Sequence, residues 1–186
     1  MDLQRNFKLI LDELALATGA VSDEAGQALV LSIMEAGCIF VAGAGRSGLA
    51  MRAFAMRLMH LGFDVHVVGD VTTPSIGASD LLLIGSGSGS TGSLLSMAGK
   101  ARTIGSRIAL ITIRNRSPIA DLTDIVLTIP APTPKITVET GYRSLQPMGS
   151  LFEQSLWLTL DALSMTVMQQ IGADGEAMFG RHANLE

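Results

Sequence analysis

The amino-acid sequence predicts an α/β fold, a three-layer α/β/α sandwich built on a five-stranded parallel sheet. Five short apolar runs recur along the chain, at residues 38–42, 65–68, 81–84, 107–113 and 125–129. They are continuously apolar instead of alternating with polar residues, which is typical of strands covered on both faces. Helical segments separate most of these runs, at about 46–62 and 91–105 and near 117–122. Alternating strands and helices form parallel sheets with right-handed crossovers.

Two helices are expected before the first strand. The first spans residues 2–18 and is amphipathic. Its apolar residues recur at helical spacing, at Leu3, Phe7, Ile10, Leu11 and Leu14. The second helix begins at Ser22, a residue type that caps helix N-termini, and runs to Ala36. Gly37 is expected to stop it.

A long helix is expected near the C-terminus, at about 149–171. Its apolar face is formed by Phe152, Leu156, Leu160, Leu163 and Val167. An irregular stretch with prolines at 130, 132, 134 and 147 precedes it. Because no internal repeat or linker composition interrupts the chain, residues 1–186 are interpreted as a single domain.

The composition predicts an oligomer. Of the 186 residues, 48% are hydrophobic and 16% charged, and the mean hydropathy is +0.41. A monomer of this size has difficulty covering so much apolar side chain, so a buried subunit interface is expected. A membrane span is not expected, because a bilayer needs about 18 to 20 apolar residues in a row. The most apolar long segment, 149–171, carries Glu153, Gln154 and Asp161.

Charge and rare residue types exclude further classes. The net charge is −4 and the basic residues are scattered, which excludes a nucleic-acid partner. Cys38 is the single cysteine and no signal-peptide pattern occurs, so a cytoplasmic protein is predicted. His60, His66 and His182 lie far apart in the sequence, and no C-x-x-C or H-x-x-x-H motif occurs, so no metal site is expected.

A hydroxyl-rich tract lies between the strand at 81–84 and the helix at 91–105. It reads Ser86, Gly87, Ser88, Gly89, Ser90, Thr91. In open parallel sheets, ligands bind at the carboxyl ends of strands, where helices begin with unpaired N–H groups and a dipole that favours anions. Glycines let the backbone approach closely, and hydroxyls add donors. The tract is therefore interpreted as a phosphate cradle; the alternative, a flexible linker, would interrupt a strand–helix unit.

A second glycine-rich turn, Gly43-x-Gly45-x-x-Gly48, follows the strand at 38–42. Its spacing fits the dinucleotide-binding fingerprint, and an acidic residue, Asp70, lies just past the next strand, so a nicotinamide-dependent oxidoreductase is one hypothesis. That hypothesis leaves the tract at 86–91 without a role. Two hydroxyl-bearing turns at neighbouring strand ends favour one phosphate monoester. The residues expected to bind it in this turn are Gly45, Arg46 and Ser47. For Arg46, a contact with a sugar oxygen and a solvated position are the alternatives.

The motif "GAGRSG" followed by "SGSGST" resembles the SIS (sugar isomerase) domain. That domain is a phosphosugar-binding fold whose five-stranded parallel sheet has a flavodoxin-like strand order. Longer motifs resemble the 6-phospho-3-hexuloisomerase family over essentially the full chain. They are "GAGRSGLAMRAFAMRLMHLGF", "TTPSI", "QPMGSLFEQ" and the C-terminal "RHANLE".

The resemblance implies an isomerase that interconverts D-arabino-hex-3-ulose 6-phosphate and fructose 6-phosphate in formaldehyde fixation by the ribulose monophosphate pathway. It implies a cis-enediol intermediate formed without metal or cofactor, a homotetramer, and functional coupling to hexulose-phosphate synthase. Two alternatives stay open. One is another SIS isomerase, such as arabinose-5-phosphate isomerase, and the other is a non-catalytic SIS domain that binds sugar phosphates.

Two residues are catalytic candidates. The resemblance implies a catalytic glutamate near the start of the last long helix, where Glu153 lies; alternatively, Ser150-x-x-Glu153 is a capping box. His182 has the chemistry for ring opening or for proton transfer between O2 and O3 of the sugar. The alternative for His182 is a frayed C-terminal tail. We expect His182 to complete the site of a neighbouring subunit.

Overall fold

The computed structural model describes residues 2–134, 136 and 141–185. All five predicted strands form, and they pair in one parallel sheet with the order β2-β1-β3-β4-β5. They are β1 (Ile39–Gly43), β2 (Val65–Val67), β3 (Leu81–Gly85), β4 (Arg107–Thr112) and β5 (Ile125–Thr128). This is the flavodoxin-like order. The predicted sheet is therefore confirmed.

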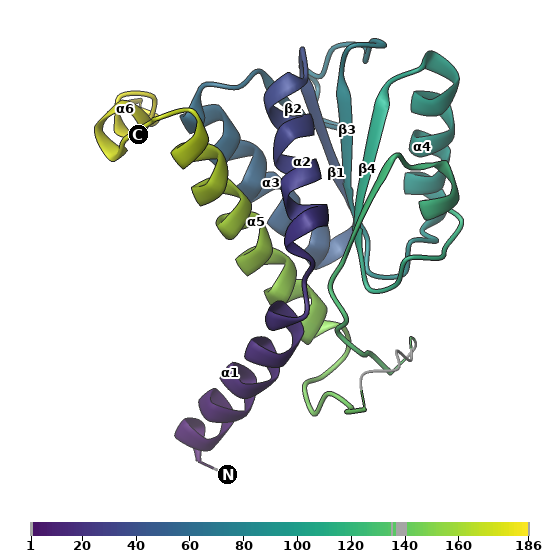
Figure 1. The fold of residues 1–186 in the computed structure, drawn as a ribbon, viewed down its shortest axis with the longest axis vertical. Helices are drawn as coiled ribbons and strands as arrows, with labels where there is room; N and C mark the ends of the chain where they lie inside the picture. Colours follow the sequence, from purple (N-terminus) through teal and green to yellow (C-terminus); the bar gives the residue numbers. More distant parts are fainter. Residues whose placement is uncertain (1, 135, 137–140, 186) are drawn as a thin grey trace.

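Helices cover both faces of this sheet (Figure 1). One face carries α2 (Asp23–Glu35), α3 (Gly45–Leu61) and α5 (Ser150–Gln170), and the other carries α4 (Gly92–Ile104) and η1 (Ala120–Leu122). The first helix, α1 (Leu3–Gly19), packs against α5 and projects away from the body of the molecule. The three-layer α/β/α sandwich is thus confirmed. No helix within the described residues is long and apolar enough to cross a membrane.

The strands are continuously apolar because successive side chains enter two different cores. Leu83 of β3 and Ile111 of β4 pack under α2, α3 and α5, whereas Leu82 and Ile84 pack under α4. Each of these four side chains is at most 3% exposed. Burying a leucine or isoleucine of this size contributes about 1.5 to 3 kcal/mol, so a polar residue on either side of a strand would be costly.

The N-terminus of α2 is as predicted from the sequence, whereas its C-terminus differs from the prediction. Ser22 is the N-cap, and its Oγ accepts a hydrogen bond from the Ala25 N–H at 3.3 Å. The helix ends at Glu35 with an extended C-cap, and Gly37 does not cap it. Gly37 instead lies against the loop before β3, where an added Cβ would come within 3.2 Å of the Ser79 Oγ.

The predicted apolar face of α1 exists, but the described part of the chain leaves most of it uncovered. Leu3 and Leu11 are each 64% exposed and Phe7 is 50% exposed, whereas Ala17 at the far end is fully buried. A short helix that the sequence did not predict, α6 (Gly175–Phe179), follows α5. Its N-cap is Asp174, whose carboxylate accepts a hydrogen bond from the Ala177 N–H at 2.8 Å.

Candidate functional site

A pocket of about 420 Å³ lies at the carboxyl end of the sheet. We call it the sheet-end pocket. Ser47 comes from the start of α3, and Glu153 comes from the start of α5. Phe152, also from α5, lines the pocket too. The remaining lining residues come from the loops after β3, β4 and β5: Gly87, Ser88, Ser90, Ile113, Arg114, Thr133, Pro134, Ile136, Met148 and Gly149. The structure therefore brings both predicted hydroxyl turns and Glu153 to one cavity.

Three helices begin around this pocket without a side-chain cap, which leaves backbone donors free for an anion. The N-caps of α3, α4 and α5 are Ala44, Thr91 and Gly149, and none of them makes a side-chain cap hydrogen bond. The other α-helices of the described residues, α1, α2 and α6, all begin with a side-chain cap. The first N–H groups of an uncapped helix generally lack protein partners, and the helix dipole adds attraction for negative charge. At α5, however, the Ser150 N–H donates to the Pro147 carbonyl at 3.1 Å.

The tract after β3 is an ordered loop, so the linker interpretation is wrong. The Gly87 carbonyl accepts hydrogen bonds from the Ile113 N–H and the Thr112 Oγ1, both at 3.2 Å. Gly89 has a φ of +59°, and a Cβ built on it would collide with Ser117. Glycine is required at this position on both grounds. The loop is therefore fixed against the segment that follows β4.

Within this loop, the predicted binding residues have different positions. Gly87, Ser88 and Ser90 line the pocket, and the Ser88 Oγ accepts a hydrogen bond from the Ser90 N–H at 3.2 Å. Ser86 is only 4% exposed, and it and Thr91 lie outside the set of pocket-lining residues. Thr91 nevertheless forms the N-cap of α4 and thereby sets where that helix begins. Ser88 and Ser90 are thus the tract's hydroxyls that a ligand can contact directly.

The turn at 43–48 is explained by packing, without a dinucleotide. A Cβ on Gly43 would lie 2.8 Å from the Gly48 Cα, so both glycines are needed for the close approach of α3 to β1. Asp70, the candidate ribose ligand, is held by Arg52 through contacts of 2.8 and 3.2 Å, one to each carboxylate oxygen. Both oxygens are thus already paired. This geometry does not support the oxidoreductase hypothesis.

Glu153 is not a capping residue. Gly149, and not Ser150, is the N-cap of α5. The Glu153 carboxylate instead forms an ion pair of 2.5 Å with the Arg46 Nε at the start of α3. The Glu153 side chain is 20% exposed and the Arg46 side chain 65% exposed, so the arginine faces solvent over a mostly covered carboxylate. The capping interpretation is therefore wrong, and the carboxylate that lines the pocket is paired with Arg46.

His182 lies at the opposite end of α3 from this pocket. Its ring stacks on His60, with 5.3 Å between the ring centroids, and the Arg181 Nη1 donates to the His60 carbonyl at 3.2 Å. Burial, then the charges of His182 and Arg57, lower the pKa of His60. From Arg46 to His60 the helix rises about 21 Å, at 1.5 Å per residue. Within one chain, His182 and Glu153 are therefore far apart.

Sequence reasoning missed Arg114, which follows β4 and lines the sheet-end pocket beside Ser88. It is an exposed cation next to the uncapped start of α4. Arginine binds phosphate oxygens through a planar set of donors. Its position just past an apolar strand was the signal in the sequence, since residues after parallel strands gather at one edge of the sheet.

A second missed residue, Glu13 of α1, fixes the loop that carries the pocket wall. It is 7% exposed, and its carboxylate accepts hydrogen bonds from the Ser144 Oγ and the Leu145 N–H, each at 2.7 Å, and from the Gln146 Nε2 at 3.1 Å. Met148 follows with a φ of +57°, an uncommon conformation for a residue with a side chain. Glu13 is therefore a positioning residue for the segment before α5.

An apolar groove of about 380 Å³ lies beside the sheet-end pocket, between α1, α3 and α5. Its apolar lining includes Leu49 (62% exposed), Trp157 (46%) and Leu158 (47%). Arg46 and Glu153 line the groove as well, and Glu153 also lines the sheet-end pocket, so the two cavities meet at Glu153. The exposed apolar surface of the groove therefore extends to Glu153, the candidate catalytic residue.

Comparisons with known proteins identify the family of this chain. Residues 32–157 match the SIS domain family. The chain is 45% identical to a 3-hexulose-6-phosphate isomerase of Bacillus subtilis over 95% of each chain, and 44% identical to one of Mycobacterium gastri over 100% of this chain and 92% of the relative. A crystal structure from Methanococcus jannaschii, from which the function of a 3-hexulose-6-phosphate isomerase was inferred, is 33% identical. It has a TM-score of 0.84 and covers 98% of this chain and 99% of that one.

The five-stranded parallel fold is that of an SIS domain. The chain belongs to the SIS domain family and, within it, to the family of 3-hexulose-6-phosphate isomerases. That name and 6-phospho-3-hexuloisomerase denote the same enzyme. The resemblance read from the sequence is therefore confirmed.

Proposed function

We propose that this protein is a phosphosugar isomerase that interconverts D-arabino-hex-3-ulose 6-phosphate and fructose 6-phosphate in the ribulose monophosphate pathway. Support comes from relatives of that name that are 44–45% identical. The observation in the structure that carries the proposal is the convergence of three uncapped helix N-termini and a carboxylate on one pocket. Such a pocket suits a ligand with a phosphate at one end and a reacting carbon at the other.

The reaction moves a carbonyl group from C3 to C2. A base removes the proton from C2, a cis-enediolate forms, and a proton is delivered to C3 while the oxygens exchange a proton. Glu153 is the base, because it is the carboxylate that lines the pocket. Arg46, which contacts that carboxylate, provides donors for the developing oxyanion.

The phosphate is bound by the hydroxyls of Ser47, Ser88 and Ser90, by the N–H groups of Gly87 and the helix starts, and by Arg114. The phosphate lies several bonds from C2, so its binding energy positions the reacting carbon without taking part in the chemistry. No step of this scheme uses a metal or an organic cofactor.

We further propose that the chain, as one domain over residues 1–186, forms a homotetramer in the cytoplasm and is coupled to hexulose-phosphate synthase, which makes its substrate. The uncovered apolar residues of α1 and of the groove support a subunit interface there. An interface at the groove would cover the Arg46–Glu153 pair. His182 of a neighbouring subunit would then complete the site, since the described chain holds its own His182 at the other end of α3.

The activity is tested with fructose 6-phosphate carrying ¹³C at C2, incubated with the purified protein in deuterated water. We expect the C2 signal to move from the hemiketal position of cyclic fructose 6-phosphate to a carbinol position as the 3-ulose forms, with deuterium appearing at C3 of the remaining fructose 6-phosphate. Deuterium at C1 would indicate a different, 1,2-isomerase. Absence of both conversion and exchange would refute an isomerase function. Arabinose 5-phosphate serves as the competing substrate and is expected to react far more slowly.

The phosphate cradle is tested by Ser88→Ala. Loss of one charge-assisted hydrogen bond should weaken fructose 6-phosphate binding by about 1.5 to 3 kcal/mol, roughly 10- to 150-fold in Kd. Ser96→Ala is the matched control, because Ser96 is exposed on α4 outside the pocket lining. Calorimetric titration gives both Kd values and thermal unfolding gives both Tm values. An unchanged Kd for Ser88→Ala would remove this hydroxyl from the phosphate site.

A further inference from the structure

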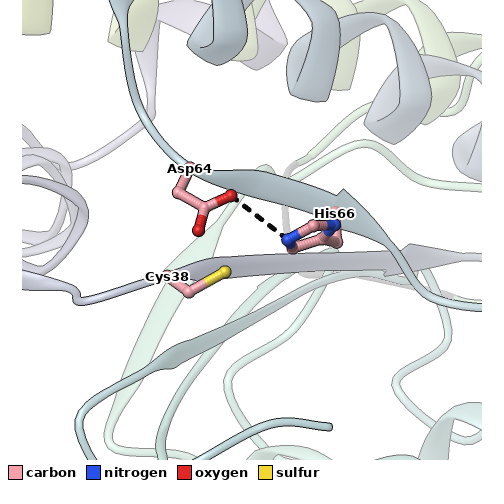
Figure 2. A group of neighbouring side chains, drawn as sticks. All are labelled: Cys38, Asp64 and His66. Atoms are coloured by element: carbon pink, nitrogen blue, oxygen red, sulfur yellow. Dashed lines mark ion pairs between the residues drawn. The ribbon is translucent and has the colours of Figure 1, made fainter. Parts of the chain in front are cut away.

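Three potential metal ligands lie together at the amino end of the sheet, away from the sheet-end pocket. Cys38 directly precedes β1, Asp64 directly precedes β2, and His66 lies within β2. One donor atom from each lies within 4.8 Å of the others, and the His66 Nε2 is 3.1 Å from the Asp64 Oδ1 (Figure 2). The sequence did not predict this group, because its members are brought together by strand pairing.

The sheet register explains the arrangement. Ile39 pairs with Val65 and Phe40 with His66, so Cys38 lies opposite Asp64. Asp64 and His66 are two residues apart and therefore point to the same side of the strand. The Ile39 N–H donates to the Asp64 carbonyl at 2.9 Å, which fixes the two chains at this point. The donors are thus held by backbone pairing instead of by flexible loops.

The chemistry of the three donors suits a borderline divalent cation such as Zn²⁺. Zinc binds thiolate at about 2.3 Å, and imidazole and carboxylate at about 2.0 to 2.2 Å, in tetrahedral geometry. Those bond lengths place neighbouring donors roughly 3.3 to 3.7 Å apart, so the present group needs only small side-chain rotations. Asp64 is exposed and β2 is an edge strand, so a water molecule from the solvent would supply the fourth ligand.

We propose that Cys38, Asp64 and His66 form a binding site for one Zn²⁺ or a similar borderline divalent cation. The ion would join the edge strand β2, which is only three residues long, to β1. Its role would be to stabilise this edge of the sheet, remote from the isomerase chemistry. The three ligands lie outside the sheet-end pocket, so the metal site does not depend on which substrate that pocket binds.

Two simpler interpretations explain less of the geometry. An ion pair accounts for Asp64 and His66, and a side-chain hydrogen bond between Cys38 and Asp64 accounts for the sulfur, but neither contact uses all three donors together. A reactive thiol does not fit, because burial, followed by the charges of Asp64 and Asp80, raises the pKa of Cys38 to about 11. A thiolate is the nucleophilic form of cysteine, so the free thiol reacts only slowly at neutral pH. The same two carboxylates that disfavour a thiolate alone attract a divalent cation.

The test is a titration of the chelator-treated, reduced full chain with Co²⁺, followed by competition with Zn²⁺. We expect a thiolate-to-cobalt absorption band that saturates at one equivalent and disappears when Zn²⁺ is added. Cys38→Ser should abolish the band, and His66→Asn should weaken binding by at least about tenfold, the loss typical of even an outer-shell partner. His182→Asn is the matched control and should bind Co²⁺ like the wild type.

The fold of each variant is verified by circular dichroism and by isomerase activity, which should be unchanged for Cys38→Ser and His66→Asn. A wild-type chain without the band, or a His66→Asn variant that binds within tenfold of the wild type, overturns the site.

A second measurement needs no mutation. Because Cys38 is the single cysteine, Zn²⁺ but not Mg²⁺ should slow its reaction with a thiol reagent at least tenfold in the native wild type. Equal rates with both cations would also overturn the proposal.

Discussion

Replacing Glu153 by glutamine is expected to lower the isomerase rate by about 10²- to 10⁴-fold, the contribution typical of a general base. The amide keeps the shape of the side chain and can still accept a hydrogen bond from Arg46, but it cannot take a proton from C2. Because Glu153 does not cap α5, its loss should not shorten that helix. We therefore expect kcat to fall sharply while KM and Tm change little.

Glu35→Gln is the matched control for this variant. Glu35 also pairs with an arginine, Arg107, at 2.8 Å, but on the exposed amino-end side of the sheet. An exposed pair of this kind contributes at most about 1 kcal/mol to stability and nothing to the reaction. Steady-state rates and thermal unfolding of both variants separate catalysis from folding. A stable Glu153→Gln protein with nearly wild-type kcat would show that another group is the base.

The fold was predictable because its signals are local. A strand buried on both faces needs apolar residues at every position, and the run from Leu81 to Ile84 shows this directly. A helix of several turns can be predicted from the helical spacing of its apolar residues, as for α3 and α5. The short helix α6 was missed, because five residues are too few for a period to be visible.

The site was predictable in part. The two hydroxyl turns could be placed because the carboxyl ends of parallel strands share one edge of a sheet, whatever their distance in the sequence. Glu153 showed a local capping pattern, yet its actual partner, Arg46, lies far away in the chain and on another helix. A pattern of near neighbours cannot reveal such a pairing.

Buried polar contacts between distant segments were not predictable. The Glu13 carboxylate meets its partners about 130 residues later in the sequence, within the loop before α5. On a helix that otherwise looks amphipathic, a glutamate is expected to face water. The group of Cys38, Asp64 and His66 depends in the same way on which residues the register of β1 and β2 places side by side.

The second large effect is expected from combining two inactive variants, which tests whether the site is shared between subunits. Glu153→Gln lacks the base, and His182→Ala lacks the proposed proton carrier. Each homo-oligomer should be nearly inactive, because every one of its sites lacks one group. His182 cannot serve its own chain's pocket in the observed arrangement, since it stacks on His60 at the far end of α3. A fully active His182→Ala enzyme would exclude a catalytic role for His182.

Co-folding the two variants builds hybrid oligomers in which some sites take Glu153 from one chain and His182 from the next. With random assembly at equal amounts, about one quarter of such shared sites contain both intact groups, because the two donors are chosen independently. Activity should therefore recover to about a quarter of the wild-type value and decline on either side of the equal ratio. Mass spectrometry of the differently tagged chains verifies that hybrids form. If each site used both groups from a single chain, every site in the mixture would remain defective. A hybrid population without recovered activity would thus refute the shared site, while leaving the isomerase activity and the role of Glu153 intact.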